Sequence, residues 1–573
     1  MDDDFYASST NVRPPSSAWR SVAWGAITSP NVVLALLLGP FIIAIVTRYL
    51  SGRSVEASSN GKAKRPWKLP YWVPGVGHGF PFLMNPVKLM REAGDRSPHD
   101  MFSLNLGGTT HNIISDPSLV RSVMAQREST LLFKPIAISV VRKFFGIPPE
   151  SVRKFDKVWD EMNATTSYLM REPHIGIMID RTVHYLENHI PQMITFTDAD
   201  IDLQPWERWA NASYISSTET EINLMTLMRD MMGNASVPAM FGSAFIEKYP
   251  DILHDIYATD AGMYFFLLGL PAWTPWPGVI KAHIARRNVW QALDEHQRAL
   301  DALALGKPFD YSWGELDDVS EFIVKRNEVQ RRNGFEIRER GEFSVLWALV
   351  VNSSLLVYWQ LLYILSVPGL ADRIRAEIAP YVTVTQGATI GKISETPKLH
   401  ISHPELSRNC PLLKSTYFEA LRMSDQPWSV RQVGQDVVIS GDKKADDPAT
   451  YLLKKGEYVT IPHDLHMKDP KYFKYPEEFD PERFLVTKED GSVEANMGTI
   501  RPYGGGPSWC KGRIIAEREC LAQVAGILAF WDITPADKQA GWVIPKQKKT
   551  AAVSLPVHET RVRIKRRVFD WER

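Results

Sequence analysis

The feature that most constrains this chain is a glycine-rich loop near its C-terminus that runs directly into a helical segment. Residues 501–513 place Tyr503 before three consecutive glycines, and Cys510 and Gly512 follow. Glycines let a backbone pass close to a flat ligand where side chains would collide. Because residues 514–530 have helical character, Cys510 lies at a helix start, where a thiolate is favoured. Such a cysteine suits axial ligation of haem iron, and the alternative is a glycine-rich turn with an ordinary buried cysteine.

Length and composition exclude several classes of protein. The chain has 573 residues, 44% of them hydrophobic, so it can bury a large core. Its 66 basic and 66 acidic residues cancel, which gives no basis for nucleic-acid binding. The three cysteines, Cys410, Cys510 and Cys520, are too few and odd in number for a disulfide framework and indicate a reducing compartment.

The N-terminal region predicts a membrane anchor. No residue between Arg20 and Arg48 is charged, and about 20 predominantly apolar residues are enough to span a bilayer. We expect residues 1–28 to be lumenal and residues 29–50 to form the transmembrane helix. The basic excess follows the apolar segment, so the bulk of the chain should be cytosolic. A cleaved signal peptide and a buried core helix are the alternatives.

The remainder divides into a hinge and one large body. Residues 51–85 are basic and proline-rich, which favours a stiff connection without helix. Residues 86–573 are expected to form the catalytic domain, mainly α with a small β-sheet region. Brief alternation on both sides of Gly107 and Gly108 predicts a hairpin, and the alternating basic tail at 561–567 predicts an edge strand.

Two apolar stretches in the body need different explanations. Residues 341–365 are apolar on nearly every face and predict a central buried helix, with a second membrane span as the alternative. Residues 264–280 are aromatic and interrupted by prolines. They fit either a loop packed in the core or a contact with the membrane interface, where Trp and Tyr are favoured.

The glycine-rich loop resembles the haem-ligand loop of the cytochrome P450 family. Tyr503, Gly506, Cys510 and Gly512 fill the four characteristic positions, although Tyr503 stands where the family more often has phenylalanine. The resemblance implies that Cys510 is the axial ligand of the haem iron and that these four residues hold haem b. It also implies the cytochrome P450 fold behind one N-terminal transmembrane helix.

Two further motifs precede the loop in the order that the family shows. Glu419 and Arg422 form a Glu-x-x-Arg pair on a predicted helix, and Arg483 follows in a Pro-Glu-Arg-Phe sequence. By resemblance these three residues form a buried ion-pair cluster that fixes the cysteine loop. The Glu-x-x-Arg pair alone is also compatible with an ordinary local ion pair.

The helix at 341–365 departs from the family pattern. Members usually carry an acid and a threonine there for proton delivery, whereas this chain has Val351 and Asn352. Asparagine at this place resembles a branch with sterol 7α- and 12α-hydroxylases and prostacyclin synthase. Val351, Asn352 and Ser353 are the predicted catalytic positions, with Ser353 or a water assisting, and Ala348 is predicted to line the substrate pocket. Asn352 could instead be a satisfied core amide.

Other site residues follow from the resemblance. Arg431 is predicted to pair with a haem propionate, with a surface arginine as the alternative. Trp428, Val430 and Val553 should face substrate, and their apolar character suits a hydrophobic ligand. The family's Trp-x-x-x-Arg motif is not found after Trp159, so a second propionate partner stays unassigned.

The expected function is haem-thiolate monooxygenation of a sterol-, terpenoid- or other lipid-like substrate in specialised metabolism. The chain has no flavin or nicotinamide motif, so electrons are expected from NADPH through a cytochrome P450 reductase. The expected location is the endoplasmic reticulum membrane, with a single span. Two alternatives remain: a haem-thiolate isomerase that rearranges a peroxide without reductase, and a non-enzymatic, membrane-tethered protein that binds haem or a ligand.

Overall fold

The computed structural model describes residues 30–52, 63–387, 389–390, 393–441, 450–550 and 552–569. The chain divides into two compact units. Unit 1 comprises residues 1–114 and 436–459, and unit 2 comprises residues 115–435 and 460–573. The cysteine loop, the long apolar helix and every predicted site residue belong to unit 2.

Among its described residues, unit 1 wholly contains three helices and five strands. They are α2 (Pro30–Gly52), β1 (Trp67–Lys68), α3 (Gly79–Met84), α4 (Pro86–Arg96), β2 (Met101–Leu106), β3 (Thr109–Ile114), β12 (Val437–Ser440) and β13 (Thr450–Leu453). The predicted hairpin is confirmed, because β2 and β3 pair antiparallel across Gly107 and Gly108, which both have positive φ. The expectation that the proline-rich piece holds no helix is wrong, since α3 includes Pro81.

Helix α2 covers most of the predicted anchor. Its apolar side chains are largely exposed, as at Leu37 (61%) and Phe41 (69%). Within the described residues, the one helix that is long and apolar enough to cross a membrane is α16 (Glu342–Ser366), and the apolar helix Leu37–Gly52 is shorter. Membrane insertion of α2 therefore stays a prediction.

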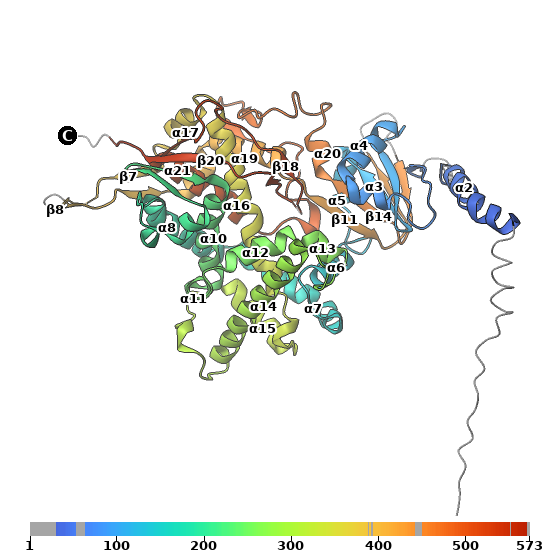
Figure 1. Ribbon diagram of the computed structural model, residues 1–573, viewed down its shortest axis with the longest axis horizontal. Coiled ribbons are helices and arrows are strands. Elements are labelled where there is room, and N and C mark those ends of the chain that lie inside the picture. The colour runs from blue at the N-terminus through green and yellow to red at the C-terminus, as the bar shows by residue number, and fades with distance from the viewer. Residues whose placement is uncertain are drawn as a thin grey trace, which may run out of the picture. The chain divides into compact units, whose positions relative to one another are not determined.

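Unit 2 is built mainly of helices (Figure 1). Its first half contains α5 (Pro117–Met124), α6 (Lys134–Lys143), α7 (Val152–Thr165), α8 (His174–His189), α9 (Pro205–Trp209), α10 (Leu224–Phe241), α11 (Ser243–Lys248), α12 (Ile252–Ala261), α13 (Met263–Leu267), α14 (Pro277–Ala304) and α15 (Glu321–Arg332). Its second half contains α16, α17 (Leu370–Ile378), α18 (His403–Asn409), α19 (Pro411–Ser424), α20 (His463–Met467) and α21 (Arg513–Phe530).

The strands of unit 2 are short. They include β4 (Leu131–Leu132), β5 (Ser213–Ser216), β6 (Glu219–Asn223), β7 (Val382–Thr385), β8 (Thr389–Ile390), β9 (Ile393–Ser394), β10 (Lys398–Ile401), β11 (Trp428–Val433), β15 (Leu485–Thr487), β16 (Val493–Ala495), β17 (Trp531–Pro535), β18 (Gln547–Lys548), β19 (Leu555–Pro556) and β20 (Arg561–Arg566). The mainly helical fold with small sheets agrees with the prediction.

Helix α16 is the centre of the core, as its composition predicts. It packs against α10, α12, α19 and α21 (Figure 1). Of an 18-residue apolar stretch within the helix, 72% is buried. A helix that is apolar on all faces is stable in water only inside a core, so the alternative of a second membrane span is not supported. The helix ends before Gly369, whose φ of 73° is readily adopted by glycine.

The basic tail is a strand, but it is not an edge strand. β20 pairs with β17 on one side and with β6 on the other, in the order β17-β20-β6-β5. Its basic side chains are paired across the sheet, because Arg561 and Arg563 lie near Glu221 and Lys565 lies near Glu219. Sequence alternation could not show that β6, more than 300 positions earlier, supplies these acids.

Candidate active site

Helix α16 has one narrow face that is not packed by protein. Ala348 is exposed and Asn352 is half-buried, while most of the helix around them is buried. Positions four apart lie on the same helix face, so these two side chains form a short open stripe. Val351 lies on a different face and is 2% exposed within the core. Of the predicted positions Ala348, Val351 and Asn352, it is therefore Ala348 and Asn352 that are accessible, and Val351 that is packed in the core.

The side chain of Asn352 meets a turn from the far end of the chain. Its Oδ1 accepts a hydrogen bond from the backbone N–H of Val553 at 3.4 Å. Its amide nitrogen has no hydrogen bond among the described residues. Asn352 thus uses its acceptor to hold the turn and keeps a donor free, which differs from the fully satisfied core amide considered as an alternative.

The turn around Val553 is joined to the segment that follows α19. Asp425 and Val553 form an isolated antiparallel bridge. The N–H of Gln426 donates to the carbonyl of Ala552 at 2.8 Å, and the N–H of Ser554 donates to Ser424 at 2.8 Å. The fold therefore brings together the two segments that were predicted to face substrate.

The other predicted side chains are already engaged within the protein. Trp428 donates its Nε1–H to Asp464 at 3.1 Å, and Lys549 lies 4.0 Å from its ring centroid. Val553 is 2% exposed, whereas Val430 is half-buried. The hydroxyl of Ser353 donates to the carbonyl of Leu349 at 2.9 Å. Its proton is therefore already engaged, although the sequence predicted that Ser353 assists proton delivery.

The cysteine loop folds back on itself before α21 begins. The N–H of Cys510 donates to the carbonyl of Tyr503 at 3.1 Å. Arg513, the first residue of α21, donates to the carbonyl of Cys510 at 2.9 Å and lies over the ring of Trp509 at 4.1 Å. Cys510 consequently sits just before the helix N-terminus, as expected from the sequence.

The structure gives a steric reason for glycine at position 506, which the sequence did not reveal. A Cβ at Gly506 would lie 2.1 Å from the carbonyl oxygen of Met124 at the end of α5, and its φ is 65°. Gly504 is less crowded, with Ser429 Oγ at 3.4 Å, and Gly512 has nothing within 4 Å. The close approach at Gly506 is therefore to the protein backbone, whereas the space at Gly512 is open.

The environment of Cys510 fits a ligand that covers its sulfur. The side chain is exposed, yet burial by the surrounding protein is the largest effect on its thiol and raises the pKa. The backbone N–H groups of Gly512 and Arg513 act in the opposite direction. The thiol is accessible to a ligand, and the nearby N–H groups stabilise a thiolate. The donor set thus fits haem-iron ligation.

Tyr503 is held by a partner that sequence reasoning missed. Its hydroxyl is hydrogen-bonded to the hydroxyl of Tyr417 on α19, and burial raises the pKa of both phenols well above the usual value. Tyr417 lies two residues before Glu419 in the Glu-x-x-Arg helix. A tyrosine at the loop position where the family more often has phenylalanine was the one available signal.

Glu419, Arg422 and Arg483 lie together as one buried cluster. Arg422 donates Nε–H and Nη2–H to the two oxygens of Glu419 at 2.8 and 2.7 Å, and Arg483 Nε–H lies 3.0 and 3.1 Å from the same oxygens. The side chains of Glu419 and Arg422 are fully buried, and that of Arg483 is 11% exposed.

The cluster anchors the segment before the cysteine loop. Arg422 donates to the carbonyls of Met467 at 2.9 Å and Pro476 at 2.7 Å. Arg483 donates to the carbonyl of Lys474 at 2.7 Å. These bonds fasten residues 467–484 to α19, whereas the cysteine loop itself is bonded to α19 by the tyrosine pair.

Arg431 is buried with no carboxylate hydrogen-bonded to it among the described residues. It donates to the carbonyl of Val430 at 2.9 Å and lies over the ring of Phe133 at 4.7 Å. Burial lowers its pKa, and Glu128 acts in the opposite direction. A buried guanidinium with spare donors fits an anionic partner such as a propionate.

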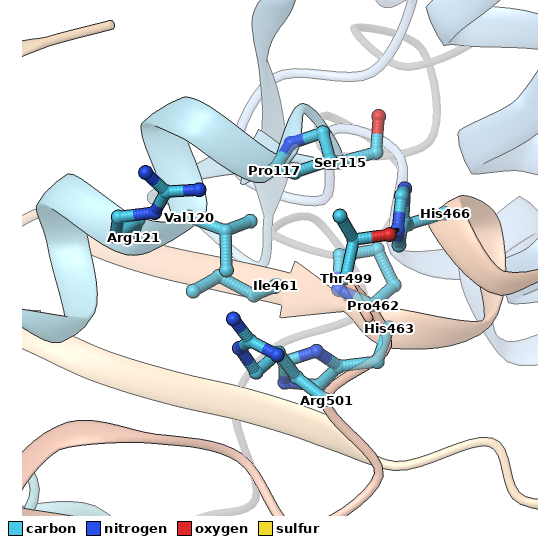
Figure 2. Close-up of a pocket in the computed structure, with 10 residues that line it drawn as sticks. All are labelled: Ser115, Pro117, Val120, Arg121, Ile461, Pro462, His463, His466, Thr499 and Arg501. Carbon is cyan, nitrogen blue, oxygen red and sulfur yellow. Dashed lines mark hydrogen bonds between the residues drawn. The ribbon is translucent and has the colours of Figure 1, made fainter. Parts of the chain in front are cut away.

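Further basic side chains adjoin this region. Arg431, Arg501 and the ring of His466 act electrostatically on His463, whose pKa falls to about 3, mainly because of burial. Figure 2 shows His463 and Arg501 on one side of a small cavity and Arg121 on the other. Its volume of about 20 Å³ suffices for a water molecule. Arg501 is therefore the candidate for the propionate partner that the sequence left unassigned, whereas His463 is uncharged at neutral pH and its Nε2 is hydrogen-bonded to Ser429 Oγ at 2.9 Å.

Comparison with known proteins decides what this architecture belongs to. The sequence profile named Cytochrome P450 matches residues 342–563, which include α16, the Glu419 cluster and the cysteine loop. A cytochrome P450 monooxygenase of Penicillium oxalicum is 25% identical over 90% of this chain and 95% of its own length. Residues 342–563 therefore form a cytochrome P450 domain, and the chain is similar over most of its length to cytochrome P450 monooxygenases.

Two mammalian relatives agree with the expected branch, and one of them is named for its substrate. Cytochrome P450 7B1 of Mus musculus is 28% identical over 90% of this chain and 92% of its own length. The 7-alpha-hydroxycholest-4-en-3-one 12-alpha-hydroxylase of Homo sapiens is 23% identical over 88% of this chain and 94% of its own length. This P450 is therefore an oxidoreductase of the haem-thiolate type that receives electrons from a redox partner, and the non-enzymatic alternative is not supported.

Proposed function

We propose that this P450 hydroxylates an apolar, polycyclic lipid of sterol or terpenoid type, in specialised metabolism. The observation that carries the proposal is the accessible pair on α16: Ala348 is exposed, and Asn352 accepts from the turn at Val553 while its amide nitrogen keeps a free donor. A small apolar side chain next to one free amide donor suits a hydrocarbon skeleton with a single oxygen substituent. Similarity to relatives named for sterol hydroxylation, a 25-hydroxycholesterol 7-alpha-hydroxylase of Rattus norvegicus and the human 12-alpha-hydroxylase, supports the same substrate class.

In this proposal the haem is held by the residues of the cysteine loop. Cys510 supplies the thiolate, which increases electron density on the iron and favours cleavage of the O–O bond of dioxygen. Tyr503, Gly506 and Gly512 would shape the loop, and the guanidinium groups of Arg431 and Arg501 would pair with the propionates of haem b. The Glu419 cluster keeps residues 467–484 in place behind this loop.

Asn352 orients the reacting groups in the absence of an acid and a threonine. Its free amide N–H would donate to an oxygen atom of the substrate, while its Oδ1 stays on the Val553 N–H. An amide does not ionise, so protons reach the site through water. Ser353 is not part of this route, because its hydroxyl is bonded to Leu349.

The proposal places the protein at the endoplasmic reticulum with α2 as a single membrane anchor and the catalytic domain, residues 86–573, in the cytosol. Residues 1–28 are then lumenal, and residues 51–85 connect the anchor to the catalytic domain. The exposed apolar surface of α2 supports this placement. Electrons come from NADPH through a cytochrome P450 reductase.

The foundation is tested by the carbon-monoxide difference spectrum of the reduced, full-length protein. We expect a thiolate-type Soret band in the wild type and its loss in Cys510→Ala. A band that survives this substitution would overturn the assignment of Cys510. The substrate class is then tested by product analysis with reductase and NADPH against a library of sterols, terpenoids and fatty acids. Conversion of the fatty acids alone would contradict the polycyclic class.

A second candidate function rests on the same helix. The lack of a carboxylate and a hydroxyl at Val351 and Asn352 also suits rearrangement of a peroxide, which requires no proton delivery. Turnover of a lipid peroxide without NADPH and reductase, together with no product from dioxygen when both are present, would favour this isomerase over the monooxygenase.

A further inference from the structure

A run of exposed apolar residues precedes and begins α14. Leu268 is 56% exposed, Trp273 82%, Trp276 56% and Ile284 48%. Only part of the stretch at 264–280 is packed inside, as Phe266 is 4% exposed. Large apolar side chains are costly to leave in water, and tryptophan is favoured at the interface between water and lipid. The alternative of a wholly core-packed loop is therefore wrong.

A groove of about 520 Å³ lies beside this run. Its volume is in the range of small-molecule binding sites. It is lined by Gly146, Pro148, Ala272, Ile280, His283, Ile284, Arg286, Arg287, Trp290 and Arg338. The lining is amphipathic, because apolar side chains of α14 share the groove with three guanidinium groups. Ala272 joins it directly to the exposed Trp273.

The three arginines are unequally committed to other partners. Arg338 donates to Asp294 at 2.5 Å and leaves little free charge. Arg286 donates to the carbonyls of Lys143 and Phe144 at 3.2 Å each and lies 3.9 Å from the ring centroid of Phe266.

Two positive charges in the groove are consequently not neutralised. Burial lowers the pKa of Arg286 to about 10, so it remains a cation at neutral pH. Arg287 is exposed and has no ion pair or hydrogen bond among the described residues. A guanidinium matches a phosphate geometrically, because its donors form a planar fork.

The surroundings add positive charge and little negative charge. Arg142 and Lys143 at the end of α6 and Lys281 on α14 are exposed. The nearby acids are engaged, since Asp294 binds Arg338 and Asp255 accepts from Asn288 at 3.2 Å. Basic residues near an anionic membrane surface each add about 1 kcal/mol of attraction.

We propose that this groove binds the headgroup of an anionic phospholipid, with Arg286 and Arg287 on the phosphate and Ile280 and Ile284 against the adjoining acyl chain. The proposal rests on the membrane placement proposed above. It adds a lipid-specific contact on unit 2 that is separate from the anchor. An acidic protein could pair with the arginines of the groove, but such a partner would not explain the exposed tryptophans or the apolar side chains of Ile280 and Ile284.

The test uses the full-length, haem-loaded protein in detergent and a fluorescent short-chain phosphatidylserine. We expect saturable binding that unlabelled phosphatidylserine displaces and phosphatidylcholine does not. Arg287→Gln should weaken binding about fivefold, as expected for one lost charge of about 1 kcal/mol, and Arg287→Glu should weaken it further. Arg208→Glu, which changes an exposed arginine on α9 outside the groove, is the matched control and should bind as the wild type does.

Several outcomes would overturn the proposal. They are wild-type affinity in Arg287→Glu, equal displacement by phosphatidylcholine, and equal displacement by inorganic phosphate or by an acidic peptide. Association with phosphatidylcholine vesicles is measured in parallel. If the full chain does not associate with them, the membrane placement fails. If it associates but the probe does not bind, only the groove proposal fails, and the carbon-monoxide spectrum tests the haem independently of both.

Discussion

The hydroxyl of Tyr417 on α19 is hydrogen-bonded to the hydroxyl of Tyr503 in the cysteine loop. This bond links the helix that carries the Glu419 cluster directly to the loop that carries Cys510. Glu419, Arg422 and Arg483 hold the segment at 467–484, so the loop depends on a different contact for its position. The sequence predicted that the ion-pair cluster alone fixes the cysteine loop. In the structure the cluster holds residues 467–484, and the tyrosine pair holds the loop.

The tyrosine pair predicts a non-additive double-mutant cycle. Tyr417→Phe or Tyr503→Phe leaves the other phenol buried without this partner, so each should lower the free energy of unfolding by about 1–3 kcal/mol. Tyr417→Phe combined with Tyr503→Phe should cost less than the sum, because neither hydroxyl remains. Urea unfolding of the three variants measures the coupling, and additive costs would show that the bond contributes nothing.

Gly506 is predicted to be intolerant of any side chain. A Cβ there would approach the Met124 carbonyl to 2.1 Å, so Gly506→Ala must displace either the loop or the end of α5. We expect loss of the thiolate-type Soret band. Gly541→Ala is the matched control, because Gly541 has a similar φ of 66° with nothing within 4 Å. It should cost only about 1 kcal/mol of stability and keep the band.

Asn352 and Ser353 are neighbours with opposite predicted sensitivities. Asn352→Leu keeps the approximate volume but removes the free donor and the acceptor of the Val553 N–H. We expect at least tenfold less product per NADPH, with hydrogen peroxide released instead. Ser353→Ala should have little effect on this ratio, since that hydroxyl is bonded to Leu349. The reverse order of effects would place the critical hydroxyl at Ser353.

Glu519 should make stability depend on pH. It is 2% exposed, and burial raises its pKa to about 7, although the hydroxyls of Thr182 and Ser236 act in the opposite direction. Because the folded state holds this proton more tightly, stability falls as pH rises from the ordinary glutamate pKa of about 4.5 towards 7. The loss should approach about 3 kcal/mol and level off above pH 7.

The measurement is the free energy of unfolding as a function of pH in the wild type and in Glu519→Gln. The glutamine keeps the shape but does not titrate, so its profile should lack the decline between about pH 4.5 and 7. Identical slopes in the two proteins would show that Glu519 is not buried with a raised pKa.

The sequence by itself determined the features that depend on local pattern, namely the cysteine loop, the buried helix and the hairpin. The spacing of Tyr503, Gly506, Cys510 and Gly512 identified the loop, and the apolar character of residues 341–365 predicted the buried helix α16, with a membrane span as the alternative. These features depend on local pattern, which a single sequence displays. The hairpin of β2 and β3 was predictable for the same reason, since its two glycines mark the turn.

Only the tertiary structure decided which distant residues meet. It paired Asn352 with Val553, Tyr417 with Tyr503 and Gly506 with Met124, and it placed β20 between β17 and β6. It also turned Val351 into the core and Ala348 towards open space. Local periodicity specifies a face of a helix or strand, but the partner of that face depends on how the whole chain packs.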